Sequence, residues 1–312
     1  MQTKIIVNPM ANKGACGKRW PHIRAELEKS IGRLGDEAIA LTRARNHATQ
    51  LASQAVGAGC RRLVAVGGDG TFSEVLNGVI VDDRPLAPDL VLAQVPAGTS
   101  NELSRAFAQH SPGLAGEAIR NGQTRAVDVF RVEAKGYAGD PVHRYGCLLA
   151  IAGAPATISW RAQRAPLLKR LGPISYVIMT AITTLSYRPR SCHIRIDDEA
   201  EHNQRIWGLL LCSFEGAGER LRLAPGADPA DGKLDLVMLG DLGRWEILTR
   251  VVPRLGDGSY LAATKISRRQ VIRVTISSDR HVRADVDGES IGYLPMSVTL
   301  LPFRMRVAAQ RP

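Results

Sequence analysis

The chain has 312 residues, a length that favours two domains, and its hydrophobic content of 45% is enough for a packed core that the 5% aromatic content makes mostly aliphatic. The net charge of +11 indicates an anionic partner, but the basic residues are dispersed, which argues against nucleic acid and favours nucleotide phosphates or an anionic membrane surface. Five scattered cysteines without a Cys-x-x-Cys pair argue against a disulfide framework and a cysteine zinc site.

The first third of the chain alternates short apolar runs with helical patterns. A helix face is indicated by residues that recur at intervals of three or four: Trp20, Ile23, Leu27, Ile31 and Leu34. A second helix would be capped by Asn46 and ended by Gly57 and Gly59. Strands are expected at Lys4–Val7, Ala38–Leu41, Leu63–Val66 and Leu90–Val95. Such alternation predicts a parallel sheet with helices on both faces, an α/β domain over residues 1–126 that the segment 301–312 would complete.

The character of the sequence changes near Asp128, where a β-rich second domain over residues 127–300 is expected. Its strands are predicted at Val127–Val132, Arg144–Ile151, Ser191–Ile196, Trp207–Ser213, Leu234–Leu239, Gln270–Ile276, His281–Val286 and Ser297–Leu300. Helical stretches are predicted at Ala154–Ala165, Ser175–Leu185 and Arg244–Arg254.

The N-terminus shows no secretory signal pattern, and the longest apolar stretch falls short of the ~20 residues of a spanning helix. A cytoplasmic protein is expected, in peripheral contact with the inner face of a membrane at most. Oligomeric state cannot be read from the sequence.

The run Gly67-Gly68-Asp69-Gly70-Thr71 lies between a predicted strand and a predicted helix. Glycines there let a ligand approach the backbone, and the N–H groups of a helix start favour phosphate. Asp69 would repel phosphate unless Mg²⁺ lay between them, as in phosphoryl transfer. The run is neither a Walker A motif nor a dinucleotide fingerprint, and an ordinary strand–helix turn is the alternative.

Two further turns follow predicted strands. Pro96-Ala97-Gly98-Thr99-Ser100-Asn101-Glu102 suits phosphate or ribose, although Ser100 as a plain helix cap is the alternative. Asn8-Pro9, with Gly14 behind it, is weak by itself. Because parallel strands end at one sheet edge, where open α/β sheets bind ligands, the three turns together predict a phosphate site.

These motifs resemble the catalytic domain of diacylglycerol kinases, which bacterial soluble lipid kinases, sphingosine kinases and ceramide kinases share. NAD kinases and phosphofructokinases share the Gly-Gly-Asp-Gly core. The resemblance includes Glu74 and Asn77 behind the glycine run, Val127-Asp128, Leu223–Ala227, Asp231–Leu236 and Asp287-Gly288-Glu289.

The resemblance implies a lipid kinase that uses ATP and Mg²⁺. By position, the nucleotide-binding residues would be Asn8, Pro9, Gly67, Gly68, Gly70, Thr71, Glu74, Pro96, Gly98, Thr99 and Asn101. Asp69 would hold catalytic Mg²⁺ and Glu289 would be the general base. Asp231, with main-chain oxygens of Asp228 and Lys233, would bind a structural Mg²⁺, but Ala230 stands where the family has a second acid.

Physical reasoning also favours a carboxylate such as Glu289, since attack by an alcohol needs a proton acceptor. The alternative is that Asp287-Gly288-Glu289 is only a hairpin turn. The basic, partly apolar segment Trp160–Leu171 would contact an anionic bilayer, or be a solvated helix face. A kinase of a soluble substrate such as NAD and a non-catalytic nucleotide- or lipid-binding protein are the alternative functions, and the sequence does not select the lipid.

Overall fold

The computed structural model describes residues 2–165, 173–217 and 221–310, and for residues 173–177 and 217 it describes the backbone only. The chain forms two compact units, one of Met1–Val129 with Phe303–Pro312 and the other of Phe130–Pro302. Two long strands, β7 (Thr124–Lys135) and β19 (Glu289–Ala308), carry the chain from one unit to the other.

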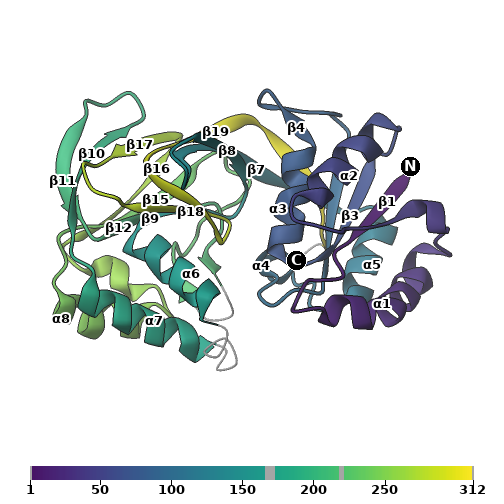
Figure 1. Ribbon diagram of the computed structural model, residues 1–312, viewed down its shortest axis with the longest axis horizontal. Coiled ribbons are helices and arrows are strands. Elements are labelled where there is room, and N and C mark those ends of the chain that lie inside the picture. Colours follow the sequence, from purple (N-terminus) through teal and green to yellow (C-terminus); the bar gives the residue numbers. More distant parts are fainter. Residues whose placement is uncertain (1, 166–172, 218–220, 311–312) are drawn as a thin grey trace. The chain divides into compact units, whose positions relative to one another are not determined.

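The first unit contains a parallel sheet in the order β2-β1-β3-β6-β19. Its other strands are β1 (Thr3–Val7), β2 (Ile39–Leu41), β3 (Arg62–Gly67) and β6 (Val91–Pro96). Both faces of β3 and β6 are buried, as expected of a parallel sheet between helices. Helices α1 (Ala15–Ile31) and α5 (Pro112–Asn121) pack together, as do α2 (His47–Gly57) and α3 (Asp69–Gly78) (Figure 1).

Smaller elements complete this unit: η1 (Asp36–Ala38), β4 (Ile80–Val81), β5 (Arg84–Pro85) and α4 (Glu102–Ala106). Leu34, expected on the face of the first helix, lies beyond its end because the helix stops at Ile31 before Gly32, although the side chain is still buried. The expectation that Asn46 caps α2 with its side chain is wrong, because Asn46 adopts a left-handed conformation and makes no such bond. The helix α5 was not predicted.

The second unit is rich in antiparallel strands. Besides β7 and β19 it contains β8 (Pro141–Gly146), β9 (Leu149–Gly153), β10 (Arg190–Ile196), β11 (His202–Ile206), β12 (Gly208–Cys212), β13 (Gly216–Ala217), β14 (Leu221–Arg222), β15 (Leu234–Leu239), β16 (Ile266–Val271), β17 (Arg273–Ser277) and β18 (Arg283–Val286). Its helical segments are α6 (Ala154–Arg164), α7 (Pro173–Ser186), α8 (Arg244–Glu246), η3 (Ile247–Val251), η4 (Val252–Arg254) and η5 (Ser259–Ala262). Figure 1 shows α6, α7 and α8 together on one side of the strands.

Alternating residues of the central strands contribute to two different cores. Leu209 and Leu211 of β12 belong to a core between strands, while Leu210 of the same strand packs with the helices. A strand points successive side chains to opposite faces, so β12 is apolar throughout because both faces are covered. The unit is therefore a β-sandwich with a helical layer on one face.

Several strand boundaries differ from the sequence prediction. Arg144–Ile151 is two strands, β8 and β9, because the backbone leaves the ladder at Cys147 and Leu148 to donate hydrogen bonds to Asp287. Gln270–Ile276 is also divided between two strands, and Ser297–Leu300 is part of the 20-residue β19. Strand β11, with the sequence HNQRI, was missed because most of its residues are polar. None of the helices in the described part of the chain is long and apolar enough to cross a membrane.

Candidate active site

The turns after β1 and β3 are joined by Asn8. Its backbone N–H donates to the Val66 oxygen at 2.9 Å, and its side-chain Nδ2 donates to Thr71 Oγ1 at 3.0 Å. Gly67 lies against the same threonine, since a Cβ at Gly67 would be 2.4 Å from Thr71 Oγ1. Pro9 packs on the start of α1, where Gly17 N–H donates to the Pro9 oxygen at 2.9 Å. Asn8, Gly67 and Thr71, predicted as nucleotide-binding residues, are therefore in mutual contact.

The turns after β3 and β6 touch at two glycines. A Cβ on Gly98 would lie 2.2 Å from the Cα of Gly68, so only glycine permits this approach. The second turn is held by Asn101, whose Oδ1 accepts from Gly98 N–H at 2.9 Å and whose Nδ2 donates to the Gly98 oxygen at 3.2 Å. Asn101 itself adopts the left-handed conformation, with φ 53°. The result is a side-chain-free surface at which a phosphate can meet the backbone.

Asp69 is the first residue of α3 and is partly buried beside this glycine contact. Its Oδ1 accepts a hydrogen bond from Gln94 Nε2 at 3.2 Å. Gln94 is buried and is held in turn by Ser104, whose N–H and Oγ donate to Gln94 Oε1 at 3.0 and 2.8 Å. Gln94 therefore orients the carboxylate. Sequence reasoning missed it, although a polar residue within the apolar run Leu90–Val95 was a signal.

The first turn continues through an unusual stretch of left-handed backbone, with φ 51° at Asn12, 56° at Lys13 and 86° at Gly14. Thr99 Oγ1 donates to Asn12 Oδ1 at 3.4 Å, so the first and third turns are also connected. Lys13 is exposed and adds a positive charge to this group of turns. Gly70, in the first turn of α3, and Pro96, at the end of β6, complete the predicted set near Asp69.

Glu74 has a different environment from the other predicted nucleotide residues. Its two carboxylate oxygens accept hydrogen bonds from Asn46 N–H at 2.9 Å and Ala48 N–H at 3.1 Å. These are orphan N–H groups of the first turn of α2, so Glu74 caps that helix in place of the Asn46 side chain. A nucleotide contact of Glu74 stays a prediction.

Glu289 lies in the other unit, at the start of β19, after a tight turn in which Asp287 and Gly288 have φ 49° and 81°. The hairpin predicted as an alternative is therefore present, and it also fixes a functional candidate. The Asp287 carboxylate accepts N–H bonds from Cys147, Leu148 and Leu149 at 2.8–2.9 Å. Helix α6 supports the turn from another side, because Gln163 Nε2 donates to the Gly288 oxygen.

A second carboxyl group in this hairpin is fully buried. Asp285 Oδ2 accepts a hydrogen bond from Ser159 Oγ at 2.8 Å, while its Oδ1 has no partner among the described residues. Desolvation raises the pKa of Asp285 to about 7, with a further contribution from the negative charges of Asp287 and Glu289. The hairpin thus concentrates three acidic residues, and burial shifts one of them toward the neutral form.

Aromatic rings surround the base of the same hairpin. The Arg283 guanidinium lies 3.8 Å from the ring centre of Trp160, 5.3 Å from that of Tyr293 and 5.9 Å from that of Tyr137. Tyr137 also hydrogen-bonds Ser290, the neighbour of Glu289. Trp160, which the sequence suggested as a membrane contact, is engaged within the unit, and the part of that segment from 166 to 171 lies outside the described residues.

The predicted structural metal loop is organised without a carboxylate cluster. Asp231 Oδ1 accepts from Lys233 N–H at 2.9 Å and Oδ2 accepts from Gln270 Nε2 at 2.8 Å, while Asp228 Oδ1 accepts from Ala230 N–H at 3.0 Å. Throughout the described ranges no group of three or more His, Cys, Asp or Glu side chains is placed to hold a metal ion. The metal assignment here stays a prediction, and it has little support from side chains.

Solved structures and curated sequences similar to the chain point the same way. A crystal structure of a diacylglycerol kinase from Bacillus anthracis strain Sterne aligns with a TM-score of 0.68 at 18% identity, covering 99% of this chain and 97% of that one. A second structure from that strain aligns with a TM-score of 0.74 at 20% identity, covering 99% and 97%. At these identities the structures establish the fold.

The curated relatives are also named diacylglycerol kinases. The protein of Staphylococcus saprophyticus is 27% identical over 94% of this chain and 90% of its own length. The protein of Bacillus subtilis is 25% identical over 94% of this chain and 91% of its own length. The protein of Mycobacterium tuberculosis strain H37Rv is 24% identical over 98% of this chain and 94% of its own length.

Family profiles match both parts of the chain. The "Diacylglycerol kinase catalytic domain" matches residues 2–132, and the "YegS C-terminal NAD kinase beta sandwich-like domain" matches residues 149–309. The match to the catalytic domain and the names of the relatives place the chain among the lipid kinases. Within that class, the chain belongs to the diacylglycerol kinase family.

Proposed function

We propose that the protein transfers the γ-phosphate of ATP to the hydroxyl of a membrane lipid, with diacylglycerol as the first candidate acceptor. One observation carries the proposal most directly: two glycines, Gly68 and Gly98, touch beside a carboxylate at the N-terminus of α3. The N–H groups at a helix start and the helix dipole favour phosphate, and the carboxylate favours a cation that phosphate also binds.

Asp69 fits a Mg²⁺ ligand. Mg²⁺ in nucleotide sites is commonly held by one or two carboxylates together with the substrate phosphates. When bound, the ion would neutralise the charge on the transferring phosphoryl group. The bond from Gln94 leaves Asp69 Oδ2 available and keeps the carboxylate in one orientation. Asn8 and Thr71 would line the phosphates, and Gly98 and Thr99 the rest of the nucleotide.

Glu289 is proposed as the general base that accepts the proton of the lipid hydroxyl. Its support comes from the rigidity of its surroundings, because Asp287 is tied to three backbone N–H groups and Gly288 is tied to α6. A proton acceptor contributes only when it is well positioned. Its partly exposed side chain at the start of β19 is accessible for such a role.

The lipid acceptor is favoured over NAD because the relatives at 24–27% identity are named diacylglycerol kinases. Retention of both Asp69 and Glu289 favours catalysis over a non-catalytic binding role. A lipid substrate implies work at a membrane surface, so we propose a cytoplasmic protein that binds the membrane peripherally. The net charge of +11 is consistent with an anionic inner leaflet.

The test is phosphorylation of a lipid panel in mixed micelles with labelled ATP and Mg²⁺, comparing the unmodified protein with two variants. Asp69→Asn is expected to abolish turnover and to weaken binding of Mg²⁺ with a non-hydrolysable ATP analogue, measured by titration calorimetry. Glu289→Gln is expected to bind the analogue normally and to lose about 10²–10⁴-fold in turnover, the usual contribution of a proton acceptor.

If the label were transferred to NAD and to no lipid, the lipid kinase proposal would give way to a kinase of a soluble substrate. Full activity of Glu289→Gln would leave Asp287-Gly288-Glu289 as a hairpin only. Full activity of Asp69→Asn would remove the basis of the phosphoryl-transfer assignment.

A further inference from the structure

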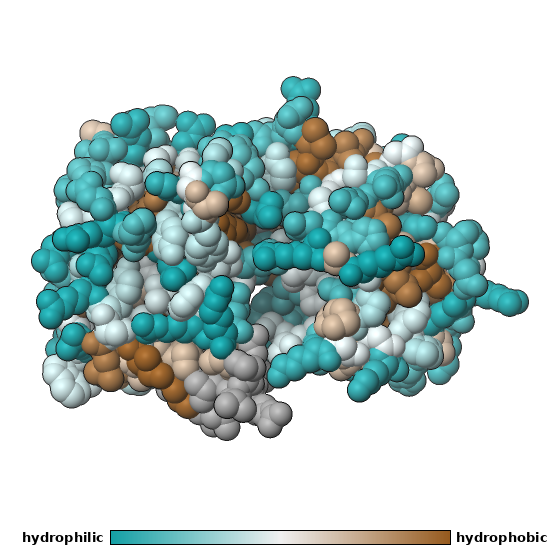
Figure 2. Space-filling model, in the orientation of Figure 1, coloured by the Kyte–Doolittle hydropathy of each residue, from teal (hydrophilic) through white to brown (hydrophobic). Residues whose placement is uncertain are grey.

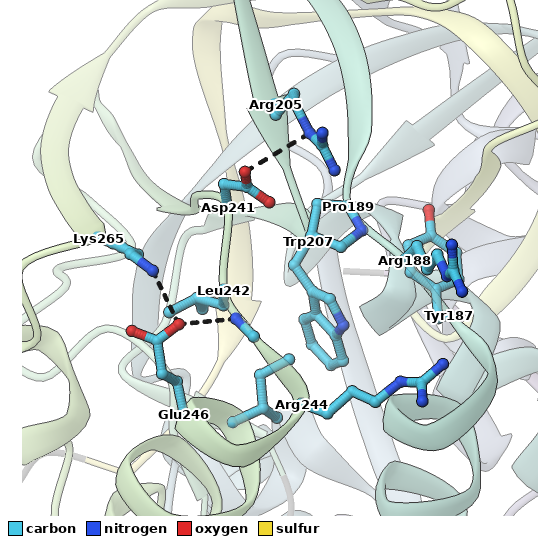
Figure 3. A pocket seen from close by; sticks show the side chains of 12 residues that line it. Tyr187, Arg188, Pro189, Arg205, Trp207, Asp241, Leu242, Arg244, Glu246 and Lys265 are labelled. Atoms are coloured by element: carbon cyan, nitrogen blue, oxygen red, sulfur yellow. Dashed lines mark hydrogen bonds and ion pairs between the residues drawn. The ribbon is translucent and has the colours of Figure 1, made fainter.

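The second unit contains a cavity that the proposed reaction does not use. It has a volume of about 320 Å³ and lies between the end of α7 and the start of α8 (Figure 3). Its walls include the rings of Tyr187 and Trp207, which meet edge to face with centroids 6.3 Å apart. The cavity is large enough for a small polar group, since ligand pockets begin near ~300 Å³.

The cavity has an excess of positive charge. Two of its cations are already neutralised, since Arg205 pairs with Asp241 at 3.5 Å and Lys265 pairs with Glu246 at 2.8 Å (Figure 3). Its other two cations, Arg188 and Arg244, are exposed and form no ion pair with any described residue. The cavity therefore has two positive charges that an anion would neutralise.

A buried donor in the same cavity wall also lacks a partner. Trp207 is only 3% exposed, and its indole Nε1–H donates to no acceptor among the described residues. Buried N–H groups are nearly always paired, because an unpaired one costs about 1–3 kcal/mol. A phosphate oxygen in the cavity would provide the missing acceptor once the side chains that cover this N–H move aside. Guanidinium groups and an N–H donor together are suited to phosphate oxygens.

Three large apolar side chains that neighbour the cavity residues in the sequence are exposed. Leu185 is 59% exposed and Ile182 45% exposed at the end of α7, and Trp245 is 78% exposed directly after Arg244. Figure 2 shows hydrophobic surface over α7. Exposed large apolar side chains next to unpaired arginines are typical of a membrane interface, where aromatic and aliphatic groups enter the lipid and cations contact phosphates.

We propose that this cavity binds the phosphate of an anionic phospholipid in the membrane surface, with Arg188, Arg244 and the Trp207 N–H as its donors and with Trp245 and Leu185 entering the lipid beside it. The bound lipid is a docking ligand and not the acceptor of phosphoryl transfer. A free phosphate would bind to the same donors but would not contact the apolar side chains. The exposed apolar side chains therefore favour a phospholipid in a bilayer over free phosphate.

The test is sedimentation with phosphatidylcholine vesicles that contain or lack phosphatidylglycerol, without ATP, so that catalysis plays no part. The double variant Arg188→Gln/Arg244→Gln is expected to bind the anionic vesicles about thirtyfold more weakly, since each surface arginine contributes about 1 kcal/mol. The control is Arg195→Gln/Arg280→Gln, which removes the same charge from exposed positions outside the cavity. This control should lose less than about threefold in affinity for the anionic vesicles, because its arginines contribute only diffuse charge, which salt screens.

A second variant tests the donor itself. Trp207→Phe keeps a ring in the core and removes the N–H, so it should weaken vesicle binding several-fold while the protein still unfolds in one cooperative thermal transition. Equal losses in the two double variants would overturn the proposal in favour of diffuse charge. So would unmodified protein that fails to bind the vesicles, or that binds inorganic phosphate through the same arginines without binding vesicles. Loss of lipid phosphorylation in Asp69→Asn with vesicle binding intact would leave the docking site standing.

Discussion

At the scale of single residues, the contact between Gly68 and Gly98 is the tightest constraint on the candidate site. Gly98→Ala would place a methyl group 2.2 Å from the Gly68 Cα, so the two turns must separate. We expect a loss of about 1–3 kcal/mol in stability, typical of overpacking, and at least tenfold weaker binding of the ATP analogue. Calorimetric titration and thermal unfolding measure the two effects.

The matched control is Gly113→Ala in α5. A Cβ there has its nearest neighbour, Ser111 Oγ, at 3.8 Å, and alanine is the better helix former. This variant should be as stable as the parent or slightly more stable, and should bind nucleotide normally. If both alanines had the same small effect, the glycine contact would not be needed for phosphate binding.

Asp285 gives the folded protein a predictable response to pH. Its pKa is about 7 in the folded state against an ordinary value near 3.8, so the folded state binds the proton more strongly. By linkage, stability is greatest below the ordinary pKa and falls as pH rises from about 4 to 7, by on the order of a few kcal/mol. Asp285→Asn should therefore raise the melting temperature more at pH 8 than at pH 5, relative to the parent.

The exposed substitution Asp279→Asn is the control for this effect, since it removes one carboxylate without burial. It should shift the melting temperature equally little at both pH values. A parent protein whose stability rises steadily between pH 4 and 7, with the same profile in Asp285→Asn, would contradict the shifted pKa.

Sequence reasoning was most useful for residues whose chemistry is local. Gly67, Gly68 and Gly98 were recognisable as positions where a ligand could approach the backbone, because they lie in turns that follow predicted strands. Gln94 and Asp285 were not, because their roles depend on partners distant in the sequence: Gln94 orients Asp69, and Asp285 is buried against Ser159. Tertiary environment determines both roles, and no spacing pattern encodes it.

At the scale of elements, the start of α2 depends on a side chain from α3. The Glu74 carboxylate accepts hydrogen bonds from two N–H groups at the start of α2, as an N-terminal cap does. Glu74→Ala should cost about 1–2 kcal/mol in stability and leave the KM for ATP unchanged, while Glu74→Gln, which keeps one acceptor, should lose less. Chemical denaturation and steady-state kinetics check the two outcomes. A tenfold rise in KM at unchanged stability would instead support the predicted nucleotide contact.

Element types were predictable where hydrophobic periodicity was strong, as for β1, β3, β6 and α1. Strand ends were not, because they depend on partners elsewhere. The break between β8 and β9 is caused by Asp287, about 140 residues later in the chain. The extent of β19 likewise depends on successive partners, including β18, β17 and β6, which no local pattern in Ser297–Leu300 reveals.

At the scale of the whole molecule, the architecture follows from the change in pattern near Asp128. Before it, strands alternate with helices and give a parallel sheet; after it, strands follow one another and give an antiparallel sandwich. The helical layer on the sandwich was harder to anticipate, because its core draws alternate residues from β9, β12 and β15, whose neighbours face the other way. The candidate docking cavity lies in that layer, and no sequence pattern indicated it directly.

At this scale, the catalytic Mg²⁺ expected at Asp69 can be distinguished from a structural Mg²⁺ at Asp231 by the response of the protein to chelation. Catalysis is expected to need the ion, because Asp69 has a phosphate-bound cation as its proposed partner. Folding is not expected to need it, because both carboxylate oxygens of Asp231 already accept hydrogen bonds and, in the described ranges, no group of three or more His, Cys, Asp or Glu side chains is placed to hold a metal ion. Chelation with EDTA should therefore abolish lipid phosphorylation while changing the melting temperature by less than about 2 °C, the lower end of the roughly 2–4 °C that 1 kcal/mol produces in a domain of 150–250 residues. Asp231→Asn should behave like the parent in both measurements. A melting temperature that falls by many degrees in EDTA, and falls equally in Asp231→Asn with Mg²⁺ present, would contradict this and would show that the Asp231 carboxylate helps to hold a structural ion.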